Sequence, residues 1–248
     1  MRTVPPCQEG SRTTPAPTTP APTTERGRRM RRLLLVAARE VFERDGFIDA
    51  RVTDIAAAAG ASHGSFYTYF GSKTEVFRTL MAETMDELYT SLRDQSQDAE
   101  EADAVERIDR ANRRFVEMYQ RNTALMALFE QVTTFDPAVR ALRQAARQRM
   151  VGRVTHSIEQ LQTDGLVSRD LDAGYSANAL VAMVNGLVHY WLVLDGDFEQ
   201  ERLVRTLTRL WAQALGLQVQ TGPAEPSSGT TAVRGRGPSR RRRGTPDR

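Results

Sequence analysis

The chain has 248 residues, 40% of them hydrophobic, which is enough for a helical body and one small additional domain but not for three domains. Its single cysteine and three histidines lack the spacing of disulfide frameworks or metal ligands, so the sequence predicts no metal, no cofactor and no catalytic site. No apolar run approaches the roughly 20 residues that cross a bilayer, so we expect a cytoplasmic protein without membrane contact.

Charge is distributed unevenly along this chain. Residues 1–32 and 218–248 each carry seven arginines against two acidic residues, whereas the stretch between them is acidic. Repeated Thr-Pro and Ala-Pro steps predict that residues 1–25 are a disordered leader. Met30 is a candidate start of the protein besides Met1. Residues 218–248 are predicted to be a disordered basic tail. An acidic body with basic ends is typical of proteins that hold nucleic acid at one end.

Residues 26–75 are predicted to form a small helical domain. Apolar residues at helical spacing predict helices at 31–44, 53–59 and 63–70. Asp45-Gly46 ends the first helix, and the last should bury Phe66 and Phe70 while leaving its polar residues outward. Two short helices joined by a three-residue turn that opens with Gly60 form a helix-turn-helix pattern, which predicts DNA binding.

A longer run makes this pattern specific. From Asp54 to Lys73 the sequence reads DIAAAAGASHGSFYTYFGSK, with helix, turn glycine, aromatic residues and lysine all in register. This run closely resembles the signature of the tetracycline-repressor (TetR) family of transcriptional regulators, and the close resemblance covers roughly residues 28–77. It implies a homodimer that binds double-stranded operator DNA and responds to a small-molecule effector.

Candidate DNA contacts lie on the third helix and around it. The polar residues His63, Ser65 and Thr68 are candidates for base contacts, and Gly64 would let the helix approach the duplex. The resemblance implies phosphate contacts for Tyr67, Tyr69 and Lys73, the only lysine in the chain. Further candidates are Arg51 and Thr53 before the second helix, Ser62 in the turn, and a basic arm of Arg26, Arg28, Arg29, Arg31 and Arg32 that would follow the minor groove.

Residues 76–217 are predicted to form a helical domain for effector binding and dimerisation. Capping residues mark its helices: Ser72 with Glu75, Asn122, and Asp136 before Pro137. Glycines follow apolar runs as helix ends do, at positions 46, 60, 165, 196 and 216. The resemblance implies an apolar pocket, for which the candidate lining residues are Phe115, Met118, Tyr119, Met126, Phe129 and Met150; plain core packing is the alternative for each.

The last two long helices, within about 172–215, are the candidate dimer interface. One carries the apolar stripe Leu180, Val184, Leu187, Val188 and Trp191, and the other carries Leu203, Leu207, Leu210, Trp211 and Leu215. These stripes would pack against a second copy, with burial inside one subunit as the alternative. The sequence therefore predicts an all-α, ligand-responsive transcriptional repressor rather than an enzyme; the competing hypothesis is a metabolite- or protein-binding helical module that has lost DNA binding.

Overall fold

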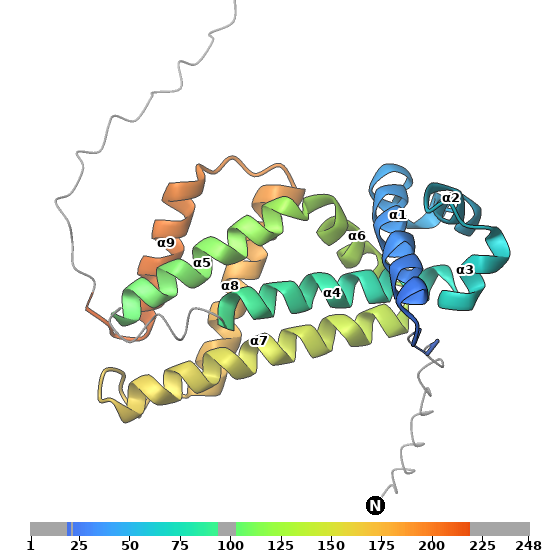
Figure 1. Cartoon of the computed structure of the whole chain (residues 1–248). Helices are drawn as coiled ribbons and strands as arrows, with labels where there is room; N and C mark the ends of the chain where they lie inside the picture. Colours follow the sequence, from blue (N-terminus) through green and yellow to red (C-terminus); the bar gives the residue numbers. More distant parts are fainter. Residues whose placement is uncertain (1–18, 21, 94–102, 219–248) are drawn as a thin grey trace, which may run out of the picture.

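The computed structural model describes residues 19–20, 22–93 and 103–218 of the chain (Figure 1). These residues form helices and no strands, which confirms the predicted all-α fold. In chain order the helices are α1 (Glu25–Asp49), α2 (Val52–Ala58), α3 (His63–Tyr69), α4 (Lys73–Arg93), α5 (Ala104–Arg121), α6 (Thr123–Thr133), α7 (Pro137–Thr163), α8 (Ala173–Val193) and α9 (Gln200–Ala214).

Helix α1 is longer than the sequence predicted. It starts at Glu25, because Thr24 caps it by accepting a hydrogen bond from the N–H of Gly27 at 3.1 Å. The arginines at 26–32 therefore lie in the first turns of a helix, so the expected basic arm is wrong for these residues. Arginine is a good helix former, and a capped run of it prolongs the helix rather than ending it. At the other end Gly46 interrupts the helix, as predicted, with a φ of 76°.

The predicted capping residues have mixed outcomes. The Ser72 hydroxyl accepts from the Glu75 N–H at 3.0 Å, but the Glu75 carboxylate reaches back to the N–H of Gly71 at 2.7 Å rather than to that of Ser72. Asp136 caps α7 as expected. Asn122 does not cap α6, because its amide donates to the carbonyl of Met118 at 2.8 Å instead.

The predicted glycine stops are confirmed at four positions and wrong at one. Gly46, Gly60, Gly165 and Gly216 all have positive φ, a conformation that costs glycine little. After α8 it is Asp195, with a φ of 55°, that adopts this conformation instead of Gly196. The N–H of Gly196 donates to the carbonyl of Tyr190 at 3.2 Å, so this glycine still takes part in ending the helix.

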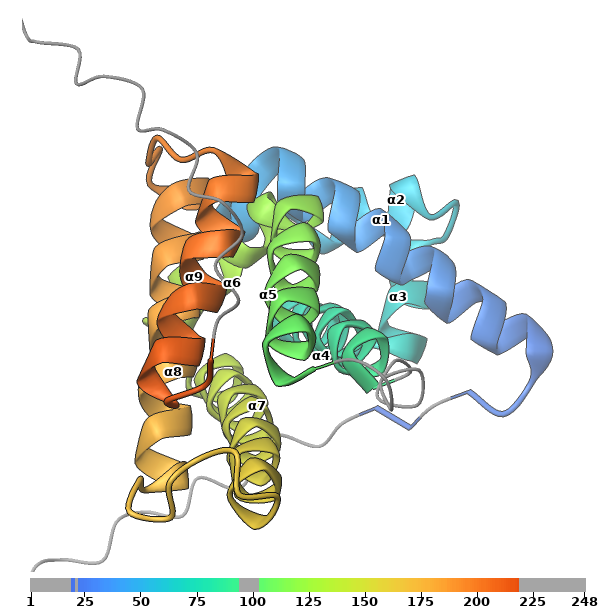
Figure 2. The ribbon, with the colours of Figure 1, turned by 90° about the vertical axis from the view of Figure 1, so that its left-hand side faces the viewer.

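Helices α1 to α3 form a head at one end of the molecule, and the remaining helices form the body (Figure 1). Helices α4 and α7 run side by side along the body, while α8 and α9 lie at the end away from the head (Figure 2). One cluster of buried side chains extends through both parts, from Phe42 and Phe66 in the head to Phe129 and Leu207 in the body. Head and body are therefore joined by a continuous apolar core.

The described end of the predicted leader contacts this framework. Thr19 donates from its N–H to one Glu75 oxygen at 2.6 Å and from its hydroxyl to the other at 3.0 Å. Residues 1–18 and 219–248, which contain most of the leader and of the basic tail with its run of arginines at 240–243, lie outside the described residues.

The apolar stripes of the last two helices are largely buried inside the subunit. Leu180, Val184 and Val188 of α8 are buried, as are Leu203 and Leu207 of α9 and Leu215 just after it. Leu210 is exposed, and the other stripe residues, Leu187, Trp191 and Trp211, are half-buried. Helix α8 packs on α7, and α9 packs on α5. The subunit's own core therefore takes most of both stripes, which agrees with the alternative of burial inside one subunit, and a second copy would meet the parts of these helices that stay accessible.

A different face of α8 is exposed. It carries Tyr175, which is 82% exposed, and Tyr190 at 51%, with the small residues Ala179, Ala182 and Gly186 exposed between them. Helix α8 is also the one helix among the described residues whose length and composition would allow it to cross a membrane. Core helices of soluble proteins share these properties, so this observation is weak evidence for a membrane span.

Candidate nucleic-acid interface and ligand pocket

The turn between α2 and α3 is built from local hydrogen bonds. Gly60, with a φ of 66°, donates to the carbonyl of Ala57 at 3.0 Å, and Ala61 donates to that of Ala56 at 2.9 Å. Ser62 then caps α3 by accepting from the N–H of Ser65 at 3.1 Å. The chain thus makes a tight turn that begins at Gly60 and is followed directly by a capped helix, which confirms the helix-turn-helix that the sequence predicted.

Two phenylalanines anchor helix α3 to the core of the head. Phe66 and Phe70 are fully buried, and their ring centroids lie 5.8 Å apart. This anchoring turns the opposite face of α3 to solvent, where His63, Gly64, Tyr67 and Thr68 are exposed. Ser65 and Tyr69, which the sequence placed outward, are only partly exposed because they lie at the edges of the buried face.

Two features of the exposed face bear on DNA contact. Tyr67 is 48% exposed, and its ring packs edge-on against His63 with centroids 5.2 Å apart, so the two side chains orient one another. A side chain at Gly64 would meet no other atom within 4 Å of its Cβ. The subunit itself therefore does not require glycine at position 64.

The candidate residues around α2 are also accessible. Arg51 and Thr53 are exposed at the start of this helix, and Arg51 makes no side-chain capping bond there. The hydroxyl of Thr53 donates to the Asp54 carboxylate at 3.3 Å. Hydroxyl, guanidinium and helix N–H groups thus lie together at one helix start, an arrangement suited to a phosphate.

Lys73, by contrast, is held by the protein itself. Its ammonium donates to the carbonyls of Ile48 and Ala50, both at 2.9 Å, and lies 4.9 Å from the centre of the Phe47 ring. Burial lowers the pKa of this ammonium from its ordinary value, against the opposing effect of Asp49. No sequence pattern indicates this role, since the two carbonyls belong to a segment more than twenty residues away.

Replacement of Lys73 by alanine should therefore destabilise the subunit as well as weaken DNA binding. The expected loss is about 1 kcal/mol in the free energy of unfolding, because water can replace part of two charge-assisted hydrogen bonds at a partly exposed site. Urea unfolding followed by helicity measures it. Unchanged stability would show that the contacts with Ile48 and Ala50 contribute nothing, and that any effect on DNA binding comes from the DNA contact alone.

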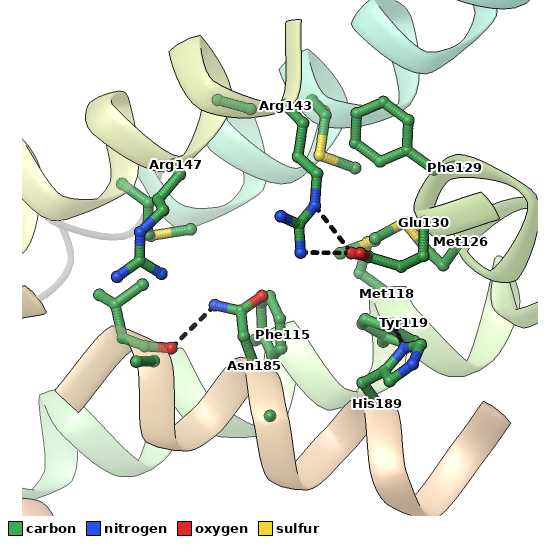
Figure 3. Close-up of a pocket in the computed structure, with 16 residues that line it drawn as sticks. Phe115, Met118, Tyr119, Met126, Phe129, Glu130, Arg143, Arg147, Asn185 and His189 are labelled. Carbon is green, nitrogen blue, oxygen red and sulfur yellow. Dashed lines mark hydrogen bonds and ion pairs between the residues drawn. The ribbon is translucent and has the colours of Figure 1, made fainter. Parts of the chain in front are cut away.

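The body contains a cavity of about 300 Å³ between α4, α5, α6, α7 and α8. The structure brings all six predicted lining residues to its wall: Phe115, Met118, Tyr119, Met126, Phe129 and Met150 (Figure 3). Its volume is at the lower end of the range for small-molecule sites. An apolar wall around a space of this size suits a small, largely apolar ligand.

Polar residues that the sequence analysis did not identify also line this cavity. They are Glu130, Arg143, Arg147, Asn185 and His189 (Figure 3). A solvated helix face and a polar pocket wall have the same sequence pattern, so only packing reveals them. The hydroxyl of Tyr119 lies 2.9 Å from Nδ1 of His189, and burial raises the pKa of this tyrosine well above its ordinary value.

Helix α6 joins this cavity to the head. Its residues Met126, Phe129 and Glu130 line the cavity, and the same helix packs against α1. At its start the guanidinium of Arg39 donates to the Asn122 side chain at 2.8 Å, and at its end Phe135 lies 6.0 Å from Phe47, ring centre to ring centre. A shift of α6 would therefore act directly on α1.

Comparisons with known proteins agree with this architecture. Residues 34–80 match the family described as "Bacterial regulatory proteins, tetR family", and residues 106–216 match the family described as "BetI-type transcriptional repressor, C-terminal". The HTH-type transcriptional regulator TtgR of Pseudomonas putida is 23% identical over 184 residues, which cover 71% of this chain and 86% of that protein.

Solved structures show the same fold. A TetR-family regulator from Mesorhizobium loti superposes with a TM-score of 0.65 at 17% identity, covering 75% of this chain and 96% of that one. A transcriptional regulator from Saccharomonospora viridis, solved in complex with choline, gives a TM-score of 0.60 at 24% identity and covers 73% and 95%.

An exposed helix-turn-helix on a helical body with a largely apolar cavity is the architecture of a DNA-binding transcriptional regulator. Since residues 34–80 and 106–216 both match families of such regulators, this protein belongs to the TetR family.

Proposed function

We propose that this chain is a cytoplasmic repressor that binds a palindromic operator as a homodimer and is released from DNA by a small, largely apolar effector. The observation that carries the proposal is the link between two sites: an exposed face of α3 for DNA, and a cavity whose α6 wall packs directly on the head. A ligand that binds only one conformation of the cavity increases the population of subunits in that conformation, and with it the head position that belongs to that conformation.

For DNA binding, the proposal places α3 in the major groove. His63 and Thr68, with Ser65 at the edge of the face, contact bases, and Gly64 allows close approach. Phosphate contacts come from donors on α3 and next to it: Arg51, Thr53, Ser62, Tyr67 and the partly exposed Tyr69, together with the remaining donor capacity of Lys73.

For dimerisation, the proposal uses the exposed face of α8. Tyr175 and Tyr190 offer apolar area, and the small residues Ala179, Ala182 and Gly186, of which the last two also border the cavity, let a second helix approach closely. Exposed apolar residues between α8 and α9, Leu194 at 59% and Phe198 at 38%, extend this face. A two-fold axis through it would present two copies of α3 to successive half-sites of a palindrome.

Operator selection with purified protein, followed by footprinting at several salt concentrations, tests the proposal. We expect a steep loss of affinity with salt and a protected palindrome. Tyr67→Phe should weaken binding about five- to tenfold on every sequence, since each subunit loses one phosphate hydrogen bond, whereas His63→Ala should change the preferred base at one position per half-site. Binding no stronger than to random DNA would refute a sequence-specific role.

The competing hypothesis, a helical module without DNA binding, requires that α3 be covered. Thr68 is exposed and Ser65 is partly exposed, so the described residues of the subunit itself leave this face of α3 accessible, which favours the repressor. Analytical ultracentrifugation of the same preparation checks the dimer, and a monomer that still binds the palindrome would contradict the proposed α8 interface.

A further inference from the structure

The charged residues of the cavity are unequal in number. Arg143 and Arg147 line it from α7, and Glu130 is the only acidic residue among the described residues of its wall. The Glu130 carboxylate accepts from two nitrogens of Arg143, at 2.9 Å and 2.7 Å. This pair is close enough for its charges to compensate one another, which leaves the charge of Arg147, a solvent-exposed residue of the cavity wall, as the excess.

Arg147 is held much more weakly than Arg143. Among the described residues, its contacts within hydrogen-bond reach are to the backbone and side-chain oxygens of Asn178, both at 3.5 Å, the outer limit for such a bond. Both guanidiniums extend from α7 toward α8 on either side of Asn185, and the Tyr119–His189 pair lies below Glu130, on the side of Arg143 (Figure 3). A ligand can therefore bind the Arg147 guanidinium in place of Asn178 without breaking a strong interaction.

The remaining wall is apolar. Phe115 and Phe129 supply aromatic faces, and Met85, Met118, Met126 and Met150 supply flexible thioethers that adapt to a ligand's shape. A guanidinium beside such a wall matches a molecule with an apolar body and one planar anionic group, because arginine binds carboxylates through two parallel hydrogen bonds.

We propose that the cavity takes a small apolar carboxylic acid, with its carboxylate on Arg147 and its body against the aromatic and methionine wall. This inference rests on the proposed function, because it names the chemical class of the effector. An organic cation is disfavoured, since the one carboxylate that would attract it is already bonded to Arg143.

Three probes with one skeleton test the charge preference: 4-phenylbutanoate, 4-phenyl-1-butanol and 4-phenylbutylamine, which are anionic, neutral and cationic at pH 7.5. Isothermal titration of the full-length protein should show the carboxylate binding at least about tenfold more tightly than the alcohol, and the amine more weakly than both. Arg147→Gln should remove that tenfold preference and leave the alcohol unchanged.

Arg149→Gln is the matched control. Arg149 lies on the same helix but does not line the cavity, and it pairs with Asp86 of α4 at 2.6 Å on the surface. It should leave all three affinities unchanged. Glu130→Gln provides an independent variant, because releasing Arg143 from its partner should tighten carboxylate binding severalfold.

Equal affinity for the three probes, no binding of any, or an equal effect of Arg147→Gln on all three would overturn the inference. DNA release is measured separately, by adding each probe to the protein–operator complex. Carboxylate binding without release would refute the proposed effector mechanism and leave the ligand class standing, whereas release by the alcohol as effective as release by the carboxylate would refute the ligand class alone.

Discussion

Replacement of Gly64 by leucine is expected to reduce affinity for specific DNA by more than about 100-fold while leaving the subunit folded. A side chain at this position meets no atom of the protein within 4 Å, and leucine recovers most of the roughly 0.8–1.0 kcal/mol that separates glycine from alanine in a helix. In the proposed complex, however, the same side chain lies between α3 and the floor of the groove. It would hold the helix away from the bases, and losing two base contacts of about 1–3 kcal/mol each gives the expected factor.

Gly152→Leu is a matched control for this change. Gly152 also lies on an exposed helix face, in α7, and a side chain there likewise meets nothing within 4 Å. Both variants should unfold at the temperature of the parent protein or slightly above it, and only the Gly64 variant should fail in a gel-shift titration with the selected operator. Equal DNA affinities for the two variants would show that position 64 does not face the duplex.

The head could be predicted closely because its geometry is set by neighbouring residues. The turn needs a residue with positive φ and then a cap, and Gly60 and Ser62 supply these in order. Likewise, Phe66 and Phe70 lie one turn apart, so their burial fixes which face of α3 remains outside. Six cavity residues were also found from the sequence, because aromatic and methionine residues on several helices have only the interior of the body to occupy.

The remaining features depend on contacts between distant segments. The two carbonyls that hold Lys73 and the partner of Arg143 are fixed only once the helices have packed. Periodicity correctly identified the apolar stripes of α8 and α9, but it cannot show whether a stripe meets its own subunit or a second one. In this protein the subunit's own core takes the stripe, and the exposed face of α8 carries small residues that have no strong hydrophobic signal.

Phe77→Ala is expected to lower the free energy of unfolding by about 3–5 kcal/mol, the usual cost of removing a fully buried phenylalanine. The ring of Phe77 lies where the head meets α4, with its centre 5.2 Å from that of Phe42 and 5.0 Å from that of Phe47, both edge-on. Its loss removes these contacts and leaves a cavity at the junction. Urea unfolding followed by helicity and by tryptophan fluorescence measures the change.

The same experiment tests whether head and body unfold together. Both tryptophans belong to the body, whereas helicity reports on all helices, so coincident curves from the two probes mean one transition. We expect coincidence in the parent and in Phe77→Ala, because the buried cluster continues without a break from Leu34 to Leu207. Phe135→Ala is the control: that ring is 52% exposed, and its loss should cost less than about 1 kcal/mol. The contradicting result would be that Phe77→Ala loses helicity early and changes its fluorescence later. The predicted boundary between residues 75 and 76 would then divide two independently stable units. Coupling from the cavity to α3 would in that case have to pass through the contacts of α6 with α1 alone.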